Sequence, residues 1–228
     1  MRYYPFVVLA LGGVVLAGDV RGAEENKADR EKALAEVKKW NGKFEADANA
    51  PGKPVVAVNL GGTRIKDAGV ATLKGLPNLR RLNLARTDLT DECLPHLKVL
   101  GQLQALDLTG TSVSSRGLEP LQGLTKMQDL NLSSTQVNDQ GLGYLKGMRD
   151  LRTLNLGLTE VSDKGLEALK GLTKLQHLNL NSTQVTNYGL KHLKGLKDLQ
   201  TLSVSVTEVT EDGVKELQKA LPKLKVTR

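Results

Sequence analysis

Apolar residues recur along the chain in one fixed frame. From Leu151 the sequence reads LRTLNLGLTEVSDKGLEALKGLTK, and from Leu175 the frame begins again as LQHLNLNSTQVTNYGLKHLKGLKD. The frame closes every 24 residues and occurs as seven units between Val55 and Pro222. A fixed period of this length is typical of a solenoid, in which each unit stacks on its neighbours. The units begin at Val55, Leu79, Leu103, Met127, Leu151, Leu175 and Leu199.

Each unit has two halves with different periodicities. Leu154 and Leu156 flank a polar residue, which predicts a short strand with one buried face. Leu166, Leu169 and Leu172 have the spacing of a helix of about two turns, too short to be stable alone. One unit cannot bury its own leucines, but stacked units can. We expect a left-handed helix end at the glycine that closes each helix, namely Gly75, Gly123, Gly147, Gly171 and Gly195.

The pattern L-x-x-L-x-L-x-x followed by Thr resembles the leucine-rich repeat. Its 24-residue form, with Thr at the ninth position and Asp-x-Gly-Leu opening the helix, resembles short bacterial repeats. It also resembles the repeats that follow an F-box in ubiquitin-ligase substrate adaptors, but no F-box-like segment precedes the repeats here. The resemblance implies an α/β solenoid shaped as an arc or horseshoe, with a parallel sheet on the concave face and short helices on the convex face. For function it implies a binding scaffold and no particular ligand.

Residues 1–23 have the pattern of an export signal. Arg2 gives a positive start, Phe6 to Gly18 is apolar, and small residues follow, with candidate cleavage sites after Ala17, Gly18 or Ala23. The apolar run is short for a bilayer span, which needs about 20 residues. We therefore expect a secreted or periplasmic protein, with an uncleaved membrane anchor as the alternative.

Both ends of the repeat array are expected to carry caps. Residues 24–54 predict an N-terminal cap, with a charged helix up to Lys39, a strand around Phe44, and Trp40 and Phe44 as plugs for the open core. The alternative is an amphipathic helix that binds a partner. Residues 223–228 are expected to end the C-terminal cap, with a last short strand.

The formal charge of +7 permits an acidic partner or an anionic surface polymer. Most of the repeated lysines, however, precede the glycine that ends a helix, where the helix dipole favours a cation. These are Lys74, Lys98, Lys146, Lys170 and Lys194. Aromatic residues make up 3% of the chain, and an exported chain without interleaved aromatics argues against nucleic-acid binding.

Candidate chemistry is sparse. Cys93 is the one cysteine, so an internal disulfide is impossible. It occupies a position that is glycine in the other six units, which predicts a small, buried and inert side chain. The three histidines lie too far apart in the frame to share a metal, and no nucleophile, phosphate-loop or metalloprotease motif occurs. We predict no catalytic role, no metal and no cofactor.

Threonine is invariant at the ninth position of all seven units, where the chain leaves the strand. Buried backbone groups there need partners, and a hydroxyl can both donate and accept. We expect these side chains to bond to neighbouring loops. The row consists of Thr63, Thr87, Thr111, Thr135, Thr159, Thr183 and Thr207.

Positions that vary while the frame stays fixed are the candidates for partner recognition. They lie on the exposed face of the strands and directly after them, and the face is poor in aromatic hot-spot residues. The predicted contact residues are Arg81, Arg86, Asp107, Asp129, Leu158, His177 and Val206. The sequence therefore predicts an exported, non-catalytic scaffold that binds another protein on its concave face. The alternatives are binding of an anionic cell-wall or surface glycan, and a purely structural repeat protein.

Overall fold

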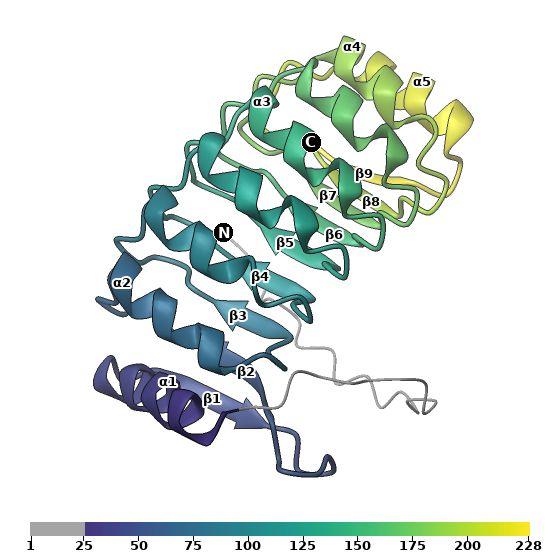
Figure 1. Ribbon diagram of the computed structural model, residues 1–228. Helices are drawn as coiled ribbons and strands as arrows, with labels where there is room; N and C mark the ends of the chain where they lie inside the picture. The colour runs from purple at the N-terminus through teal and green to yellow at the C-terminus, as the bar shows by residue number, and fades with distance from the viewer. Residues whose placement is uncertain (1–25) are drawn as a thin grey trace.

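The computed structural model describes residues 26–228. They form an arc in which strands line one face and short helices the other (Figure 1). The sheet has nine strands in sequence order: β1 (Lys43–Ala46), β2 (Val55–Asn59), β3 (Arg81–Asn83), β4 (Ala105–Asp107), β5 (Asp129–Asn131), β6 (Thr153–Asn155), β7 (His177–Asn179), β8 (Thr201–Ser203) and β9 (Lys225–Thr227). The pair β1–β2 is antiparallel and each later pair is parallel. The predicted solenoid with a concave parallel sheet is confirmed.

Most of the convex helices are 3₁₀ rather than α. The first three units have α2 (Asp67–Val70), η1 (Ala71–Gly75), η2 (Asp91–Leu97) and η3 (Arg116–Gly123). The next units have α3 (Asp139–Leu142), η4 (Gly143–Gly147), η5 (Gly165–Gly171), α4 (Asn187–Leu190) and η6 (Lys191–Leu193). A 3₁₀ helix rises more per residue than an α-helix. It therefore spans the height of the unit with fewer residues than a two-turn α-helix needs.

The leucines of the frame form one continuous core. Leu154 and Leu156 of the strand and Leu166, Leu169 and Leu172 of the helix are at most 1% exposed. The same positions are buried from the first unit to the last. Close packing of this kind makes each unit dependent on its neighbours.

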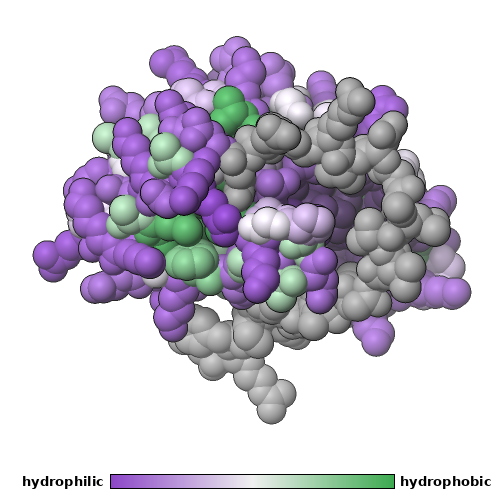
Figure 2. All heavy atoms as spheres, turned by 60° about the horizontal axis from the view of Figure 1, so that its bottom comes forward, coloured by the Kyte–Doolittle hydropathy of each residue, from purple (hydrophilic) through white to green (hydrophobic). Residues whose placement is uncertain are grey.

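Two elements close the N-terminal end, and the expected plugs are not the residues that fill it. Helix α1 (Lys27–Lys39) buries Ala33 and Val37 completely, while Trp40 is only partly buried and Phe44 of β1 is 38% exposed. The helix face that points inward carries the small residues because it lies close over the first unit. Seen with this end forward, hydrophilic residues dominate the coloured surface, with hydrophobic residues in a few small areas (Figure 2).

At the other end, helix α5 (Glu211–Ala220) belongs to the last unit and strand β9 follows it. Val214, Leu217, Leu221 and Leu224 are buried there. Within residues 26–228, no helix combines the length and the apolar character that crossing a membrane requires. The predicted export signal lies outside the described residues.

The expected left-handed glycines at the helix ends are wrong. Positive φ angles among the glycines of residues 26–228 occur at Gly52, Gly62 and Gly110, none of which closes a helix. The chain instead leaves each helix through a bond one residue later, as when the N–H of Leu172 donates to the Leu169 carbonyl. The left-handed position of each unit lies before the threonine, as described below.

The threonine row closes its own turn rather than bonding to neighbouring loops. Each Oγ1 donates to the carbonyl three residues earlier in the same unit, at 2.6–2.7 Å. That carbonyl belongs to the inward-pointing residue directly after the strand, for example Leu156 for Thr159. The expected partner was wrong because this carbonyl lies past the strand ladder and is nearest to the hydroxyl.

Adjacent units are joined by an aspartate ladder that the sequence pattern did not reveal. The carboxylates of Asp67, Asp91, Asp139 and Asp163 each accept from the backbone N–H and the hydroxyl of a Ser or Thr at or just before the start of the next unit's helix, at 2.6–2.9 Å. The glycine of the following unit makes room for this carboxylate: a Cβ on Gly117 would collide with Asp91. Helix start and repeat stacking thus depend on one interaction.

Candidate functional site: the concave face and its edge

The outward-facing residues of the strands form a ladder in register. Cα partners run in sequence through Ala57, Arg81, Ala105, Asp129, Thr153, His177, Thr201 and Lys225. Neighbouring strands of a sheet lie about 4.8 Å apart, so this ladder presents unlike side chains at a regular spacing. Three of the predicted contact residues, Arg81, Asp129 and His177, lie on it.

Two of these three residues have internal partners. Arg81 reaches past the small Ala57 and forms an ion pair with Glu45 on β1. The Nδ1 atom of His177 lies 2.8 Å from the Thr201 hydroxyl on the next strand. Asp129 is half-buried between Ala105 and Thr153. The Arg81 ion pair ties the ladder to the N-terminal cap, so a change at Arg81 would act on the cap as well as on the face.

A second outward column, occupied mostly by asparagine, shapes the turn after each strand. The side-chain oxygen accepts from the backbone N–H two residues later, as in Asn155 with Gly157 at 3.0 Å. Asp107 has the same role and also accepts from the Thr109 hydroxyl at 2.6 Å. Such Asx turns are built by the short side chain itself. Asp107 therefore has a structural role, and its contact with a partner stays a prediction.

The residue before each threonine has a left-handed backbone in every unit. We call these seven residues the left-handed row: Gly62, Arg86, Gly110, Ser134, Leu158, Ser182 and Val206. The φ angles are 70° and 64° at the two glycines and 55–58° at the other five. The N–H of Leu158 donates to the Asn181 carbonyl of the next unit at 2.8 Å, and earlier members of the row have equivalent bonds. Stacking thus holds this conformation in six of the seven members whatever the side chain is, and Val206 in the last unit adopts it without such a bond.

Three predicted contact residues, Arg86, Leu158 and Val206, belong to the left-handed row. All three are exposed, Leu158 to 60% and Val206 to 82%. They lie just beyond the strand ends, along one edge of the concave sheet. The predicted contact residues therefore fall into two parallel rows, the ladder and the left-handed row, with Asp107 at the end of β4 between them.

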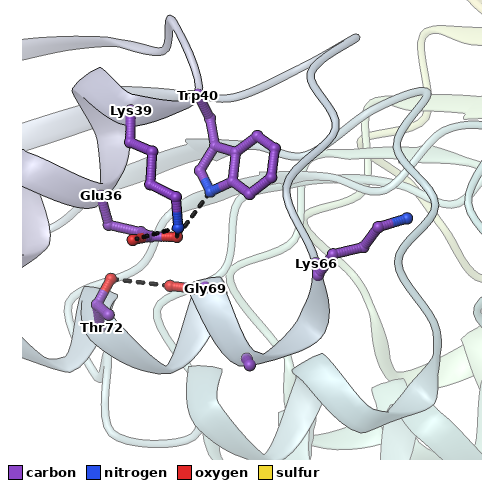
Figure 3. Close-up of a pocket in the computed structure, with 7 residues that line it drawn as sticks. Glu36, Lys39, Trp40, Lys66, Gly69 and Thr72 are labelled. Atoms are coloured by element: carbon purple, nitrogen blue, oxygen red, sulfur yellow. Dashed lines mark hydrogen bonds and ion pairs between the residues drawn. The ribbon is translucent and has the colours of Figure 1, made fainter.

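A hollow lies on the convex side, where α1 meets the first unit. It has a volume of about 300 Å³ and is lined by Glu36, Lys39, Trp40, Lys66, Ala68, Gly69 and Thr72. The Glu36 carboxylate accepts from Trp40 Nε1 at 2.6 Å and from Lys39 Nζ at 3.3 Å, and Thr72 donates to the Gly69 carbonyl (Figure 3). The polar groups of α1 satisfy one another, and Thr72 is satisfied within the first unit, so the hollow leaves none of these groups seeking a ligand.

Cys93 is fully buried and free. Burial, reinforced by the nearby charges of Asp67 and Asp91, raises the pKa of its thiol to about 12. A thiolate is the reactive form of cysteine, so this side chain is inert at neutral pH. In residues 26–228, no group of three or more His, Cys, Asp or Glu side chains is arranged to hold a metal ion.

Comparison with known proteins now identifies the repeat. The Leucine Rich repeat family matches the chain at residues 75–92, 123–146, 147–170 and 171–193. The chain is a leucine-rich-repeat protein. The crystal structure of an internalin C2 from Listeria monocytogenes is similar, with a TM-score of 0.62 and 25% sequence identity over 85% of this chain and 80% of that chain. Comparison with curated protein sequences gives no significant match.

The geometry of this leucine-rich-repeat protein adds residues that the sequence interpretation missed. Glu160 and Glu208 are exposed two positions after Leu158 and Val206, respectively, so each apolar side chain on the edge has a carboxylate beside it. The sequence signal was present, as LTEV and VTEV, but only the left-handed turn shows that both side chains face solvent. Glu45 and Lys225 extend the ladder at its two ends.

Proposed function

We propose that this leucine-rich-repeat protein is a non-catalytic scaffold that binds another protein through its concave face. The observation that carries the proposal is the contrast between the two sides of the same strands. The inward side is leucine in unit after unit, whereas the outward ladder changes from Arg81 to Asp129 to His177. A rigid core that holds unlike side chains at fixed positions reduces the entropy that binding costs.

The family resemblance supports the same proposal, since leucine-rich repeats commonly form binding scaffolds. The buried state of Cys93 and its raised pKa also favour a non-catalytic role. We propose export as well, on the basis of the positive start at Arg2 and the apolar run that follows. Mass spectrometry of the protein recovered from outside the cytoplasm tests export, because a cleaved chain would begin near Gly18 or after Ala23.

Binding of an anionic glycan has less support from the charges. Arg81 is paired with Glu45, Lys170 with Glu167, and Lys194 with Glu216. The edge of the concave sheet also carries Glu160 and Glu208. These pairs and carboxylates lower the attraction for a polyanion on both faces.

An affinity capture from an extract of the cell envelope tests the proposed function, with the chain from residue 24 onward as bait. The informative variant is Asp129→Ala with His177→Ala, which changes the ladder without touching the Arg81–Glu45 ion pair. The matched control is Lys98→Ala with Lys146→Ala on the convex side. We expect the ladder variant to lose the captured protein and the lysine variant to keep it.

The opposite result would place the partner on the convex side and would favour the glycan. In that case, binding should weaken steeply with added salt, because exposed charges are screened within about 10 Å at 0.1 M ionic strength. Thermal unfolding of both variants checks that a loss of binding reports contact and not misfolding.

A further inference from the structure

The left-handed row contains residues whose backbone conformation is costly. Glycine adopts a positive φ without penalty, and Gly62 and Gly110 show that it fits this position. A side chain other than glycine there costs roughly 1–2 kcal/mol per residue by the general estimate for L-residues. A β-branched residue such as Val206, at φ 57°, is an outlier even among these.

The fold does not require the apolar members of the row. Leu158 is 60% exposed and Val206 is 82% exposed, so neither is a member of the core. The units directly before them have Ser134 and Ser182 at the same position and with nearly the same φ. Packing therefore accounts for neither leucine nor valine at this place, and an external contact gives these side chains a role.

A second feature distinguishes the same two units. Leu158 is followed by Thr159 and Glu160, and Val206 by Thr207 and Glu208, whereas the serine units have Gln136 and Gln184 in place of the glutamates. Among residues 26–228, neither Glu160 nor Glu208 forms a side-chain hydrogen bond or an ion pair. The acidic side chain thus accompanies the apolar one, and both are available to a partner.

The two apolar–acidic pairs have equivalent positions. The backbones of Glu160 and Glu208 form equivalent parallel bridges, to Asn138 and Thr186 of the preceding units. They are two units apart, which corresponds to roughly 10 Å along the sheet. Residues seven apart on an α-helix lie on about the same face and are separated by about 10.5 Å.

We propose that these pairs, Leu158 with Glu160 and Val206 with Glu208, are the anchor points for a cationic amphipathic helix of the partner protein. Each apolar side chain contacts an apolar residue of the helix, and each carboxylate attracts a lysine or arginine beside it. The inference rests on the proposed function and specifies its partner. Charge complementarity supports it, because within residues 26–228 an exposed carboxylate without an ion pair follows each of the two exposed apolar side chains at the same position of its unit.

The test is selection of a random peptide library displayed on phage against the chain from residue 24 onward. The enriched peptides are then measured on three double variants. Leu158→Ser with Val206→Ser removes the apolar contacts, and Glu160→Gln with Glu208→Gln removes the charges. Both introduce residues that neighbouring units already have at the same positions, so both variants fold. The third variant is Asp129→Ala with His177→Ala.

We expect the enriched peptides to be basic and apolar and to lose affinity by about tenfold or more on the serine variant, as loss of a hot-spot contact does. The affinity of the peptides should also be lower for the glutamine variant, and this loss should be smaller at high salt. Peptides that bind the serine variant unchanged but fail on the Asp129–His177 variant would overturn this inference and leave the proposed function standing. Peptides that bind all three variants equally would contradict both, and a selection that enriches nothing would overturn the inference alone.

Discussion

The left-handed row and the threonine row are adjacent along the chain and differ in almost every property. Thr159 is 6% exposed and donates to the Leu156 carbonyl, while Leu158, one residue earlier, is 60% exposed and points to solvent. Threonine is present at its position in all seven units, whereas the left-handed row has glycine, arginine, serine, leucine and valine.

The contrast separates what the fold requires from what it merely permits. In the threonine row, the hydroxyl supplies a short bond to a carbonyl at the end of the strand in every unit, so the residue type is constrained. In the left-handed row, the N–H bond to the next unit fixes the conformation at every member except Val206 in the last unit, and the side chain is unconstrained. A residue that is costly there, such as Val206, is therefore informative about function in a way that Thr159 is not.

The largest difference in stability is expected between changes at two nearby leucines, the buried Leu156 and the exposed Leu158. Leu156→Ala should lower the free energy of unfolding by about 2–5 kcal/mol, because it leaves a cavity in a close-packed core. Leu158→Ala should change it by no more than about 0.5 kcal/mol, because the side chain is exposed. Denaturant titration of both variants measures the difference. Equal losses would mean that the inside and outside assignments are wrong.

The buried thiol of Cys93 should make the free energy of unfolding depend on pH. The folded thiol has a pKa of about 12, above its unfolded value of about 8.5, so the folded state keeps its proton as pH rises. The contribution to stability is full below the unfolded pKa and should fall by about 1.4 kcal/mol per pH unit between about pH 9 and 12. Cys93→Ala removes this dependence. Parallel stability–pH curves for the two proteins would contradict the buried assignment.

An intermediate loss of stability is expected for a change in the threonine row. Thr159→Val keeps the shape but removes the donor to the Leu156 carbonyl, which is then buried without that bond. The cost should be about 1–3 kcal/mol, the penalty for an unsatisfied buried group. The same change at the half-buried Thr207 should cost less, since water can reach that turn. Urea titration of the two variants tests the ranking, and a larger loss at Thr207 would refute it.

The smallest effect has the opposite sign. Val206→Gly should raise the free energy of unfolding by up to about 1 kcal/mol, because relief of the left-handed strain exceeds the entropy cost of glycine. The reciprocal change, Gly110→Val, should destabilise by a similar amount. Differential scanning calorimetry of both variants checks the signs. A destabilised Val206→Gly variant would show that valine does serve the fold.

The sequence was sufficient for the architecture because the frame repeats without interruption. Leu154 and Leu156 define the strand by alternation, and each unit adds the same evidence. The helices were less predictable: the leucine spacing is compatible with both helix types, and Pro95 and Pro120 lie within 3₁₀ segments. Contacts between units, such as Asp139 with Ser162, cannot be read from one unit alone.

The candidate site could be predicted only as a set of positions. Arg81 was identified as exposed, but its ion pair depends on β1, which lies outside the repeat and pairs antiparallel. The left-handed turn was missed because its residues include Arg86, Leu158 and Val206, and these types do not signal a positive φ. The glycines that do signal one, such as Gly171, have an ordinary backbone.

Hydrogen–deuterium exchange of the chain with and without its bound protein tests the central claim, that the concave face and its left-handed edge form the binding surface. We predict protection at residues 153–158, 177–182 and 201–206, where the strands meet the edge, and unchanged exchange at 143–147 and 165–171 on the convex side. Protection confined to the convex helices would contradict the account.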